Sequence, residues 1–287
     1  MDNLTEEKSR EKHAHETPEP LHFKNERVLY ERSFFDKVSI EFDEEKMTKW
    51  LSDRLRWELW QDVFKELGSL KGQLVLDIGC GLGFDSICLA FRGAGVVGLD
   101  VSPKSVKKAK ELATRKQIQC DFIVGSAESL PFADRSFDKS FGRAILHHVD
   151  IDACLFEVGR VTRDKCIFVE PLVLNPIVNV NRRLLDKYDR TPYEKPLLLS
   201  KTLESFKKRF KIVHHKEHHL ISPAAHIFKK LIKSQLIYTY TWNTLNKFDK
   251  VLTKRILCLK DWCWITVIAA RNPKRNINFY RSGQSRS

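Results

Sequence analysis

The sequence predicts an α/β fold with a mostly parallel sheet and helices on both of its faces. Apolar runs typical of buried strands occupy residues 75–78, 95–100 and 121–124. Between these runs, residues 84–92 and 102–112 carry apolar side chains at helical spacing. Strands that alternate with helices in this way form βαβ units, in which the strands lie parallel. A glycine-rich turn directly after the first run supports the same fold.

That turn lies in residues 75–83, Val-Leu-Asp-Ile-Gly-Cys-Gly-Leu-Gly. Glycine loops after a first strand commonly bind nucleotide phosphates. Asp77 argues against a phosphate here, because a carboxylate repels phosphate and attracts an ammonium group. The spacing also departs from the dinucleotide fingerprint G-x-G-x-x-G, since Gly83 comes one residue early and Phe84 stands in the last position. The turn therefore favours an adenosine ligand that carries an amine and no phosphate.

The second apolar run ends in Asp100, 21 positions after Gly79. An acid at this distance, at the end of the next strand, is placed to bind ribose hydroxyls. The Ser-Pro pair at residues 102–103 predicts the start of a helix. A fourth strand is expected at residues 136–141, shortly before the Leu-His-His of residues 146–148.

From about residue 29 to residue 172 the chain resembles the class I S-adenosylmethionine-dependent methyltransferases, within the type 11 group that acts on small molecules. The family motif V-L-D-x-G-C-G-x-G is met throughout by residues 75–83. The family's G-D-A-E-x-L-P-F stretch is similar to residues 125–132, with Ser126 in place of the aspartate. Further matches are the S-F-D of residues 136–138, the L-H-H of residues 146–148, the E-x-x-R of Glu157 and Arg160, and two F-D-type segments, Phe35-Asp36 and Phe42-Asp43, which in the family close over the cofactor.

The resemblance implies a Rossmann-like sheet of seven strands with an antiparallel last strand, and S-adenosylmethionine as the cofactor. It implies that Asp77 holds the methionine amine, that Asp100 takes the ribose hydroxyls, and that residues 126–128 edge the adenine. Because Ser126 replaces the usual adenine-binding aspartate, either Ser126 or Glu128 is expected to substitute for it. The expected cofactor-binding residues are Asp77, Gly79, Cys80, Gly81, Gly83, Asp100, Val101, Ser126, Ala127, Glu128 and Arg143.

Methyl transfer from a sulfonium is an in-line displacement, so the main task of the protein is to align acceptor, methyl group and sulfur. A general base helps where the acceptor is a hydroxyl or an acidic carbon. His147, His148 and Glu170 are the predicted catalytic residues, and the two histidines follow a strand at the edge where open α/β sheets bind ligands. The competing interpretation makes these histidines a helix start bonded to the backbone.

The chain is expected to divide into four segments. They are a disordered polar tail at 1–20, a helical cap at 21–70, the methyltransferase domain at 71–272 and a basic tail at 273–287. In the cap, Trp50, Trp57 and Trp60 share a helix face, which favours core packing over a substrate wall. Residues 162–165 are expected to form a surface turn before a fifth strand. A helical insertion at about 220–260 separates the sixth strand from the last one.

Positive charge is concentrated around that insertion. Residues 201–260 hold 14 Lys and Arg against 3 Asp and Glu, a difference of +11 within a formal net charge of +13 for the chain. Apolar residues from Ile227 to Leu236 recur at helical spacing among lysines. Three interpretations stay open, in descending order: a lid helix packed on the core, a helix in contact with a membrane or lipid substrate, and a nucleic-acid surface. Nucleic acid ranks last because no RNA-binding module accompanies the charge.

Other features limit the class of protein. No apolar run approaches the ~20 residues that span a bilayer, and the first residues lack a leader pattern. A cytoplasmic protein is therefore expected, with peripheral membrane contact left open. Seven scattered cysteines without metal spacing are typical of free thiols. Four of residues 214–219 are histidines, but neighbours in a strand point to opposite faces, so no metal site is predicted.

Three functions compete. The leading one is a methyltransferase with a small, hydrophobic or lipid-linked acceptor, and the second is a methyltransferase acting on RNA or protein through the basic C-terminal half. The third is a non-catalytic scaffold that binds the cofactor. Residues 143–146, Arg-Ala-Ile-Leu, lack the N/D-P-P-[YF] motif of enzymes that methylate exocyclic amines in nucleic acids, which favours the first. The sequence leaves the acceptor atom and the oligomeric state open.

Overall fold

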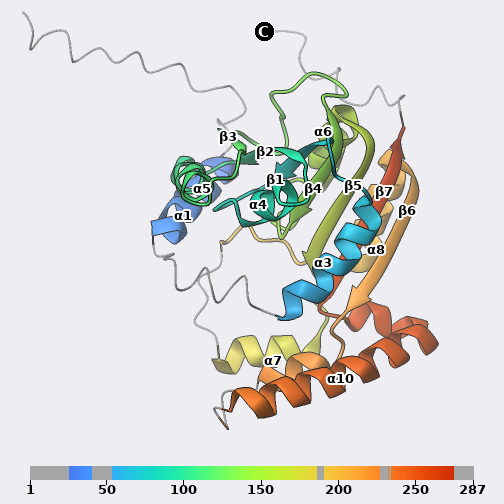
Figure 1. Cartoon of the computed structure of the whole chain (residues 1–287). Coiled ribbons are helices and arrows are strands. Elements are labelled where there is room, and N and C mark those ends of the chain that lie inside the picture. Colours follow the sequence, from blue (N-terminus) through green and yellow to red (C-terminus); the bar gives the residue numbers. More distant parts are fainter. Residues whose placement is uncertain (1–25, 41–53, 186–190, 227–231, 233, 275–287) are drawn as a thin grey trace, which may run out of the picture.

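The computed structural model describes residues 26–40, 54–185, 191–226, 232 and 234–274 (Figure 1). The elements in chain order are α1 Glu26–Ile40, α3 Arg54–Leu67, β1 Leu74–Ile78, α4 Phe84–Ala90, β2 Gly95–Asp100, α5 Pro103–Arg115, β3 Asp121–Val124, β4 Phe137–Arg143, α6 Ile151–Val161, β5 Thr162–Pro171, α7 Pro176–Leu185, α8 Leu199–Arg209, β6 Phe210–His218, η2 Ser222–Ala224, α10 Gln235–Arg255, η3 Leu257–Trp262 and β7 Ile265–Pro273. The alternation of strands and helices predicted for the first half is confirmed.

Seven strands form one sheet in the order β3-β2-β1-β4-β5-β7-β6. Strands β1 to β5 are parallel, and β7 runs antiparallel between β5 and β6. This confirms the predicted Rossmann-like sheet with an antiparallel last strand. The carboxyl ends of β1, β2, β4 and β5 therefore meet at one edge, which is where open α/β sheets bind ligands.

Apolar side chains on both faces of the sheet hold the helices in place. Along β5, Cys166 and Phe168 pack in the cluster that contains α6 and α8, whereas Ile167 and Val169 pack in the cluster that contains α3. This alternation follows from the period of two residues in a strand. Trp60 of α3 stacks on Phe141 of β4 with ring centroids 5.2 Å apart, which confirms core packing for this tryptophan.

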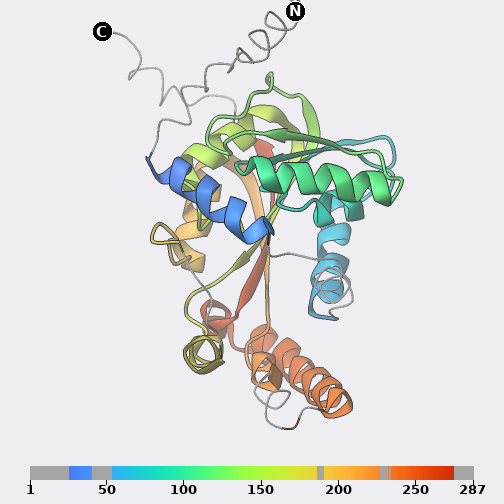
Figure 2. The same ribbon diagram turned by 90° about the vertical axis from the view of Figure 1, so that its left-hand side faces the viewer.

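A further layer of helices lies beyond the carboxyl edge of the sheet, at the bottom of the molecule in Figures 1 and 2. It consists of α7, η2, α10 and η3, and the last three form the predicted insertion between β6 and β7. Asn175, just before α7, connects the segments of this layer. Its buried Nδ2 donates to the carbonyl oxygens of Leu220 at 2.9 Å and Trp262 at 2.8 Å. Asp249 of α10 does the same by accepting hydrogen bonds from the N–H groups of residues 220–222.

Two local predictions were wrong. Residues 162–165 begin β5 and do not form a surface turn, because the buried Thr162 hydroxyl bonds Ser140 Oγ at 2.6 Å and the strand starts directly after α6. The apolar residues up to Leu236 do not belong to one helix either. Ser234 has an extended backbone (φ −101°, ψ 120°) and caps α10, so Leu236 belongs to that helix.

Several predictions concern residues outside the described part of the chain. They are the tail at 1–20, most of the tail at 273–287, Phe42-Asp43, Trp50 and residues 227–231. Within the described part, no helix is both long enough and apolar enough to cross a membrane. The same residues contain no group of three or more His, Cys, Asp or Glu side chains arranged to hold a metal ion.

Candidate active site

The glycine-rich turn connects β1 to α4 at the carboxyl edge of the sheet. The N–H groups of residues 79–80 donate to the carbonyl oxygen of Leu99 on β2 at 2.8 and 3.0 Å. The N–H of Gly81 donates to Oδ2 of Asp100 at 2.8 Å, and the N–H of Ser102 donates to Oδ1 of the same acid at 2.9 Å. The fold therefore brings the turn and the acid that ends β2 into direct contact.

The three glycines of this turn have different reasons to be glycine. A β-carbon at Gly79 would lie 2.8 Å from Ile145, and one at Gly83 would lie 2.9 Å from Ala109. These two positions are glycine because other parts of the protein pack against them. Gly81 has φ +51° and open space where its β-carbon would stand. Of the three, Gly81 is the one that leaves room for a ligand at the backbone.

Carboxylates gather next to the turn. Asp77 is buried at the end of β1, where its Oδ2 accepts a hydrogen bond from Ser86 Oγ at 2.6 Å. Burial and the nearby charge of Asp85 raise the pKa of Asp77 from 3.8 to about 7. Burial also raises the pKa of Asp100. Arg143 offsets part of this negative charge, since its Nε donates to Oδ2 of Asp85 at 2.7 Å.

This set of groups fits S-adenosylmethionine. Oδ1 of Asp85 is buried and has no hydrogen-bond partner in the described residues, and a cation beside Asp77 would return its pKa toward the ordinary range. The ammonium and sulfonium groups of the cofactor are such cations, and the carboxylates would repel a phosphate. Asp77, Gly81 and Asp100 are the residues placed to hold it. Asp85 and Ser86 were not predicted, although their place in the first turn after the glycines could have indicated them.

The loop of residues 126–128, which is expected to border the adenine, follows β3. Ser126 and Ala127 are buried, and Ser126 Oγ accepts a hydrogen bond from the Glu128 N–H at 3.3 Å. The Glu128 carboxylate accepts hydrogen bonds from Arg27 of α1 and from the N–H of Asp150. Glu128 is therefore engaged by two other segments of the protein.

Helix α1 lies along α5 and over this edge of the sheet (Figure 2). Asp36 accepts hydrogen bonds from Ser102 Oγ at 2.6 Å and from the N–H of Lys104 at 3.1 Å, at the start of α5. Glu31 is buried, and its Oε1 accepts from Thr191 Oγ1 at 2.6 Å. Arg27 donates to the carbonyl oxygen of His148. The sequence singled out Asp36 by a motif, but nothing local indicated Arg27 or Glu31.

His147 and His148 lie in the turn after β4, separated from the strand by residues 144–146, and each has a carboxylate beside its Nδ1. Nδ1 of His147 lies 3.1 Å from Oε2 of Glu170, and Nδ1 of His148 lies 3.3 Å from Oε2 of Glu31. The two imidazole centroids are 4.1 Å apart. Oε1 of Glu170 accepts the N–H groups of residues 145–146 at 2.9 Å each, and the side chain is fully buried. In this geometry Glu170 holds His147 and the N–H groups of the two residues before it.

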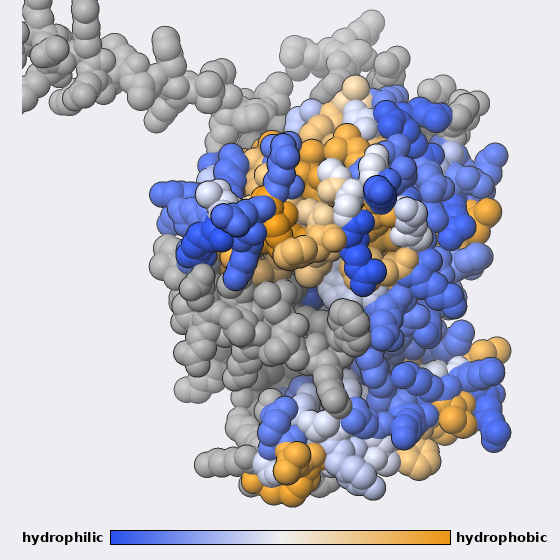
Figure 3. Space-filling model, viewed as in Figure 1, coloured by the Kyte–Doolittle hydropathy of each residue, from blue (hydrophilic) through white to orange (hydrophobic). Residues whose placement is uncertain are grey.

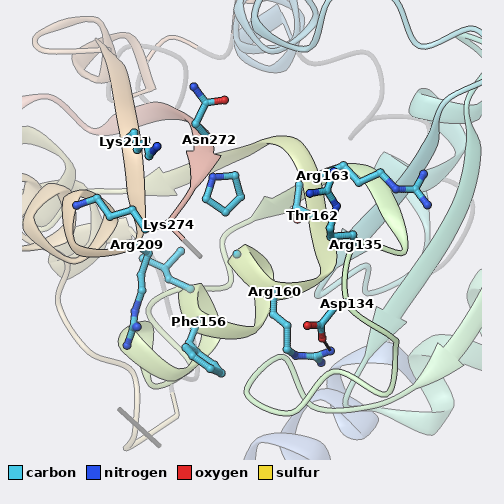
Figure 4. Close-up of a pocket in the computed structure, with 13 residues that line it drawn as sticks. Asp134, Arg135, Phe156, Arg160, Thr162, Arg163, Arg209, Lys211, Asn272 and Lys274 are labelled. Atoms are coloured by element: carbon cyan, nitrogen blue, oxygen red, sulfur yellow. Dashed lines mark hydrogen bonds and ion pairs between the residues drawn. The ribbon is translucent and has the colours of Figure 1, made fainter. Parts of the chain in front are cut away.

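A groove of about 1090 Å³ lies at the opposite end of the strands (Figure 4). Thr162 at the start of β5 and Asn272 near the end of β7 line it, whereas the glycine turn follows the end of β1. Its cationic lining residues are Arg135, Arg160, Arg163, Arg209, Lys211 and Lys274. None of the predicted site residues is among those that line it.

Relatives of the chain have been found among characterised proteins. Residues 76–169 match the family model described as a methyltransferase domain. A demethylmenaquinone methyltransferase of Renibacterium salmoninarum is 37% identical over 134 residues, which cover 46% of this chain and 53% of the relative. A ubiquinone biosynthesis O-methyltransferase of Azorhizobium caulinodans is 34% identical over 106 residues, which cover 37% and 42%. The chain spans about half the length of the curated relatives it matches.

Solved structures share the fold. A protein of Pyrococcus horikoshii superimposes with a TM-score of 0.53 at 20% identity, covering 77% of this chain and 91% of that one. Geranyl diphosphate C-methyltransferase from Streptomyces coelicolor also has a TM-score of 0.53, at 15% identity, covering 80% and 85%. The family match covers β1 to β5, and with it both the glycine turn and the acid that ends β2. Residues 76–169 therefore contain a class I S-adenosylmethionine-dependent methyltransferase domain.

Proposed function

We propose that the protein transfers a methyl group from S-adenosylmethionine to a small acceptor that is hydrophobic or lipid-linked. The observation that carries the proposal is the meeting of the carboxylates at the glycine turn with the two histidines after β4. Helix α1 connects the two sides. The centroid of the Phe35 ring lies 5.1 Å from that of the His148 ring. The neighbouring Asp36 accepts a hydrogen bond from Ser102, whose N–H donates to Asp100. Relatives named for demethylmenaquinone, ubiquinone biosynthesis and sterol methylation support a hydrophobic acceptor.

Each part of the site has a role in this proposal. Asp77 binds the methionine amine, Asp100 binds the ribose hydroxyls, and the open backbone at Gly81 borders the cofactor. When bound, S-adenosylmethionine supplies a methyl group on a positively charged sulfur, which is already a good leaving group. The remaining work of the protein is to orient the acceptor and to exclude water from the reacting atoms.

The histidines accept the proton of the acceptor. A carboxylate beside Nδ1 favours the tautomer with the proton on Nδ1, so that Nε2 carries the lone pair. Glu170 supplies this carboxylate for His147 through a hydrogen bond, whereas Glu31 lies 3.3 Å from Nδ1 of His148 without forming a hydrogen bond to it. The arrangement suits an acceptor that must lose a proton, such as a hydroxyl or an acidic carbon.

The test incubates the protein with S-adenosylmethionine labelled in the methyl group and with separated lipid, RNA and protein fractions as acceptors. We expect label in the lipid fraction, and we expect His148→Ala to reduce it by about 100-fold or more, as removal of a general base does. His214→Ala is the matched control, because His214 is exposed on β6. Label in RNA or protein would overturn the proposed acceptor. Tight binding of S-adenosylhomocysteine with label in no fraction would favour the scaffold function.

One observation favours RNA as a second candidate acceptor. The groove at the amino-terminal end of β5 is lined by six cationic side chains and one acid, Asp134, which Arg160 already binds at 2.9 Å. A phosphate backbone would be attracted to such a groove. However, the groove lies at the end of the β-strands opposite to His147. An RNA bound in the groove is therefore not directed at the histidines. The same incubation separates this candidate from the first.

A further inference from the structure

Helix α10 directs Trp242 and two polar side chains inward, and it leaves several other large apolar side chains outward. Its buried residues are Trp242, Asn246 and Asp249, two of which are polar. Asn246 Nδ2 donates to Glu58 of α3, and Asp249 accepts three backbone N–H groups. An ordinary surface helix has the reverse arrangement, with apolar residues toward the core. Within the described residues, core packing by α10 is therefore limited to Trp242 and Tyr238, and the large apolar side chains on its outer side are not part of that packing.

The outward apolar residues share one side of α10 with exposed cations, and this set of apolar residues is here called the α10 face. It consists of Leu236, Ile237, Tyr240, Phe248 and Val251 on α10, together with Ile256, Leu257 and Trp262 at and within η3. Leu236 is 84% exposed, Tyr240 76% and Leu257 68%. The successive spacings Leu236 to Tyr240, Tyr240 to Phe248 and Phe248 to Val251 are 4, 8 and 3 residues, which keep these side chains on one side of a helix.

Cations accompany the α10 face. Lys247, Lys250, Lys254 and Arg255 are exposed on α10, whereas its acid, Asp249, is buried and engaged. On η3, Lys260 lies beside the exposed Asp261. In Figure 3 the orange apolar side chains along the lower edge of the molecule lie among blue hydrophilic ones. Exposed apolar side chains interspersed with lysines and an arginine combine the two attractions, apolar and electrostatic, by which a helix binds the interface of an anionic membrane.

The place of the face in the fold is consistent with that partner. Helix α10 lies beyond the carboxyl ends of β5 and β6, the same end of the sheet that carries the histidines (Figure 1). A second copy of the chain is a poorer occupant, because a two-fold contact would place these like charges against one another. We infer that the α10 face docks the protein onto an anionic phospholipid membrane, with the apolar side chains inserted among the headgroups. This inference goes beyond the proposed methyl transfer and does not depend on it.

The test uses the full chain and lipid vesicles, without any methyl transfer. Co-sedimentation compares vesicles of phosphatidylcholine alone with vesicles that also contain phosphatidylglycerol, at low and at high salt. We expect binding to the anionic vesicles, weakened by salt. The pair Lys247→Ala and Lys254→Ala should reduce this binding by about fivefold per cation removed. Phe248→Glu should reduce it by more than about tenfold, because it places a charge in the inserted face.

Matched changes elsewhere on the surface serve as controls. Phe91→Glu changes a phenylalanine that is 72% exposed at the end of α4, and Lys107→Ala with Lys110→Ala removes two exposed cations of α5. Both the single and the double control variant should bind vesicles as the wild type does. Quenching of Trp262 fluorescence by brominated lipids gives a second measurement, which Trp262→Phe should remove.

Three outcomes would overturn the inference. One is equal binding to both kinds of vesicle, and another is Phe248→Glu binding as tightly as Phe91→Glu. The third is a concentration-dependent dimer in light scattering that Phe248→Glu abolishes, which would identify a second copy as the occupant. A circular dichroism spectrum like that of the wild type establishes that each variant is folded.

Discussion

At the residue scale, the Asp77 carboxylate is buried beside other acids at the end of β1, and this burial opposes its ionisation. Its pKa is raised from 3.8 to about 7, so the folded protein holds this proton more tightly than the unfolded chain does. The stability that results is fully present below about pH 4 and is lost as the pH rises through about 7. At neutral pH the ligand-free protein thus carries a destabilising carboxylate, which a bound ammonium group would stabilise.

Asp77→Asn should therefore have opposite effects on stability and on binding. We expect a higher midpoint of thermal unfolding for the ligand-free variant than for the wild type at about pH 8, with the difference shrinking toward about pH 4. Calorimetry should show that the variant binds S-adenosylhomocysteine more weakly. In the wild type, affinity should fall by up to about tenfold per pH unit below pH 7, because binding must release the Asp77 proton.

Asp138→Asn is the control for that prediction. Hydrogen bonds from the Leu74 N–H and from Arg163 hold the pKa of Asp138 below its usual range, at the opposite end of the strands. This variant should not be more stable than the wild type at about pH 8, and its affinity for S-adenosylhomocysteine should be unchanged. If the unfolding midpoint of Asp77→Asn does not rise relative to that of the wild type as the pH is raised, the account of Asp77 is wrong.

Asp100→Ala should reduce the affinity for S-adenosylhomocysteine by more than about tenfold in calorimetry, since two ribose hydroxyls lose a charged acceptor. Asp100 also orders the turn through Gly81 and Ser102, so the loss could arise from the loop alone. An analogue that lacks the ribose hydroxyls separates the two causes. If the variant loses as much affinity for the analogue as for the intact ligand, Asp100 acts through the loop and the ribose assignment is wrong.

At the scale of elements, α10 is held by the buried Trp242 together with a few polar contacts. Asp249 accepts hydrogen bonds from three successive N–H groups at 2.8 to 3.1 Å, at the end of β6. Helix α1 is likewise held at the site by polar contacts, through Asp36 on α5 and Glu31 on Thr191. In both helices, specific polar contacts decide how the element sits, and the exposed apolar residues of α10 remain available for a partner.

Asp249→Ala should lower the free energy of unfolding by at least about 2 kcal/mol, because it leaves buried N–H groups without an acceptor. Chemical denaturation measures this loss. Affinity for S-adenosylhomocysteine should stay the same, since Asp249 lies outside the glycine turn. Asp261→Ala, at an exposed acid of η3, is the matched control and should change stability by less than about 0.5 kcal/mol. Equal stability of the two variants would contradict the role of Asp249.

At the scale of the whole molecule, the two ends of the parallel strands carry different surfaces. The carboxyl end bears the acidic glycine turn, the histidines and the helical layer with the α10 face. The amino end bears the basic groove of Figure 4. In the described residues, the groove places six of the cationic side chains at the end of the strands opposite to the turn that would receive a cationic cofactor.

The state of the seven cysteines is also a property of the whole fold. All seven are free thiols; Cys258 is exposed and four others are buried. Burial raises the pKa of Cys120 to about 11 and that of Cys263 to about 12, which disfavours the reactive thiolate. A thiol reagent at about pH 7.5 should therefore modify one cysteine rapidly, and Cys258→Ser should remove that fast phase. Several fast thiols, or a midpoint of unfolding that depends on reductant, would contradict this prediction.

Local patterns predicted most of the sheet and the glycine turn. Buried parallel strands appear in a sequence as short apolar runs, and the turn after β1 needs glycine for reasons that lie within a few residues. The same patterns predicted Asp77 and Asp100, because the carboxyl ends of adjacent parallel strands meet at one edge. They predicted less well where a residue's role depends on a distant segment. Residues 162–165 look like a turn locally, but pairing with β4 makes them part of β5.

Two features follow only from the tertiary structure. They are the residues that hydrogen-bond to the side chains of the site, and the side of α10 that faces the solvent. Glu31 reaches Thr191, which is 160 positions away, and Glu170 reaches the turn before His147, so neither role is visible in a local pattern. The apolar stripe of α10 has the same helical period whether it faces the core or the solvent. Only the contacts of Asn246 and Asp249 determine that it faces outward, because periodicity specifies which residues share a face but not what that face touches.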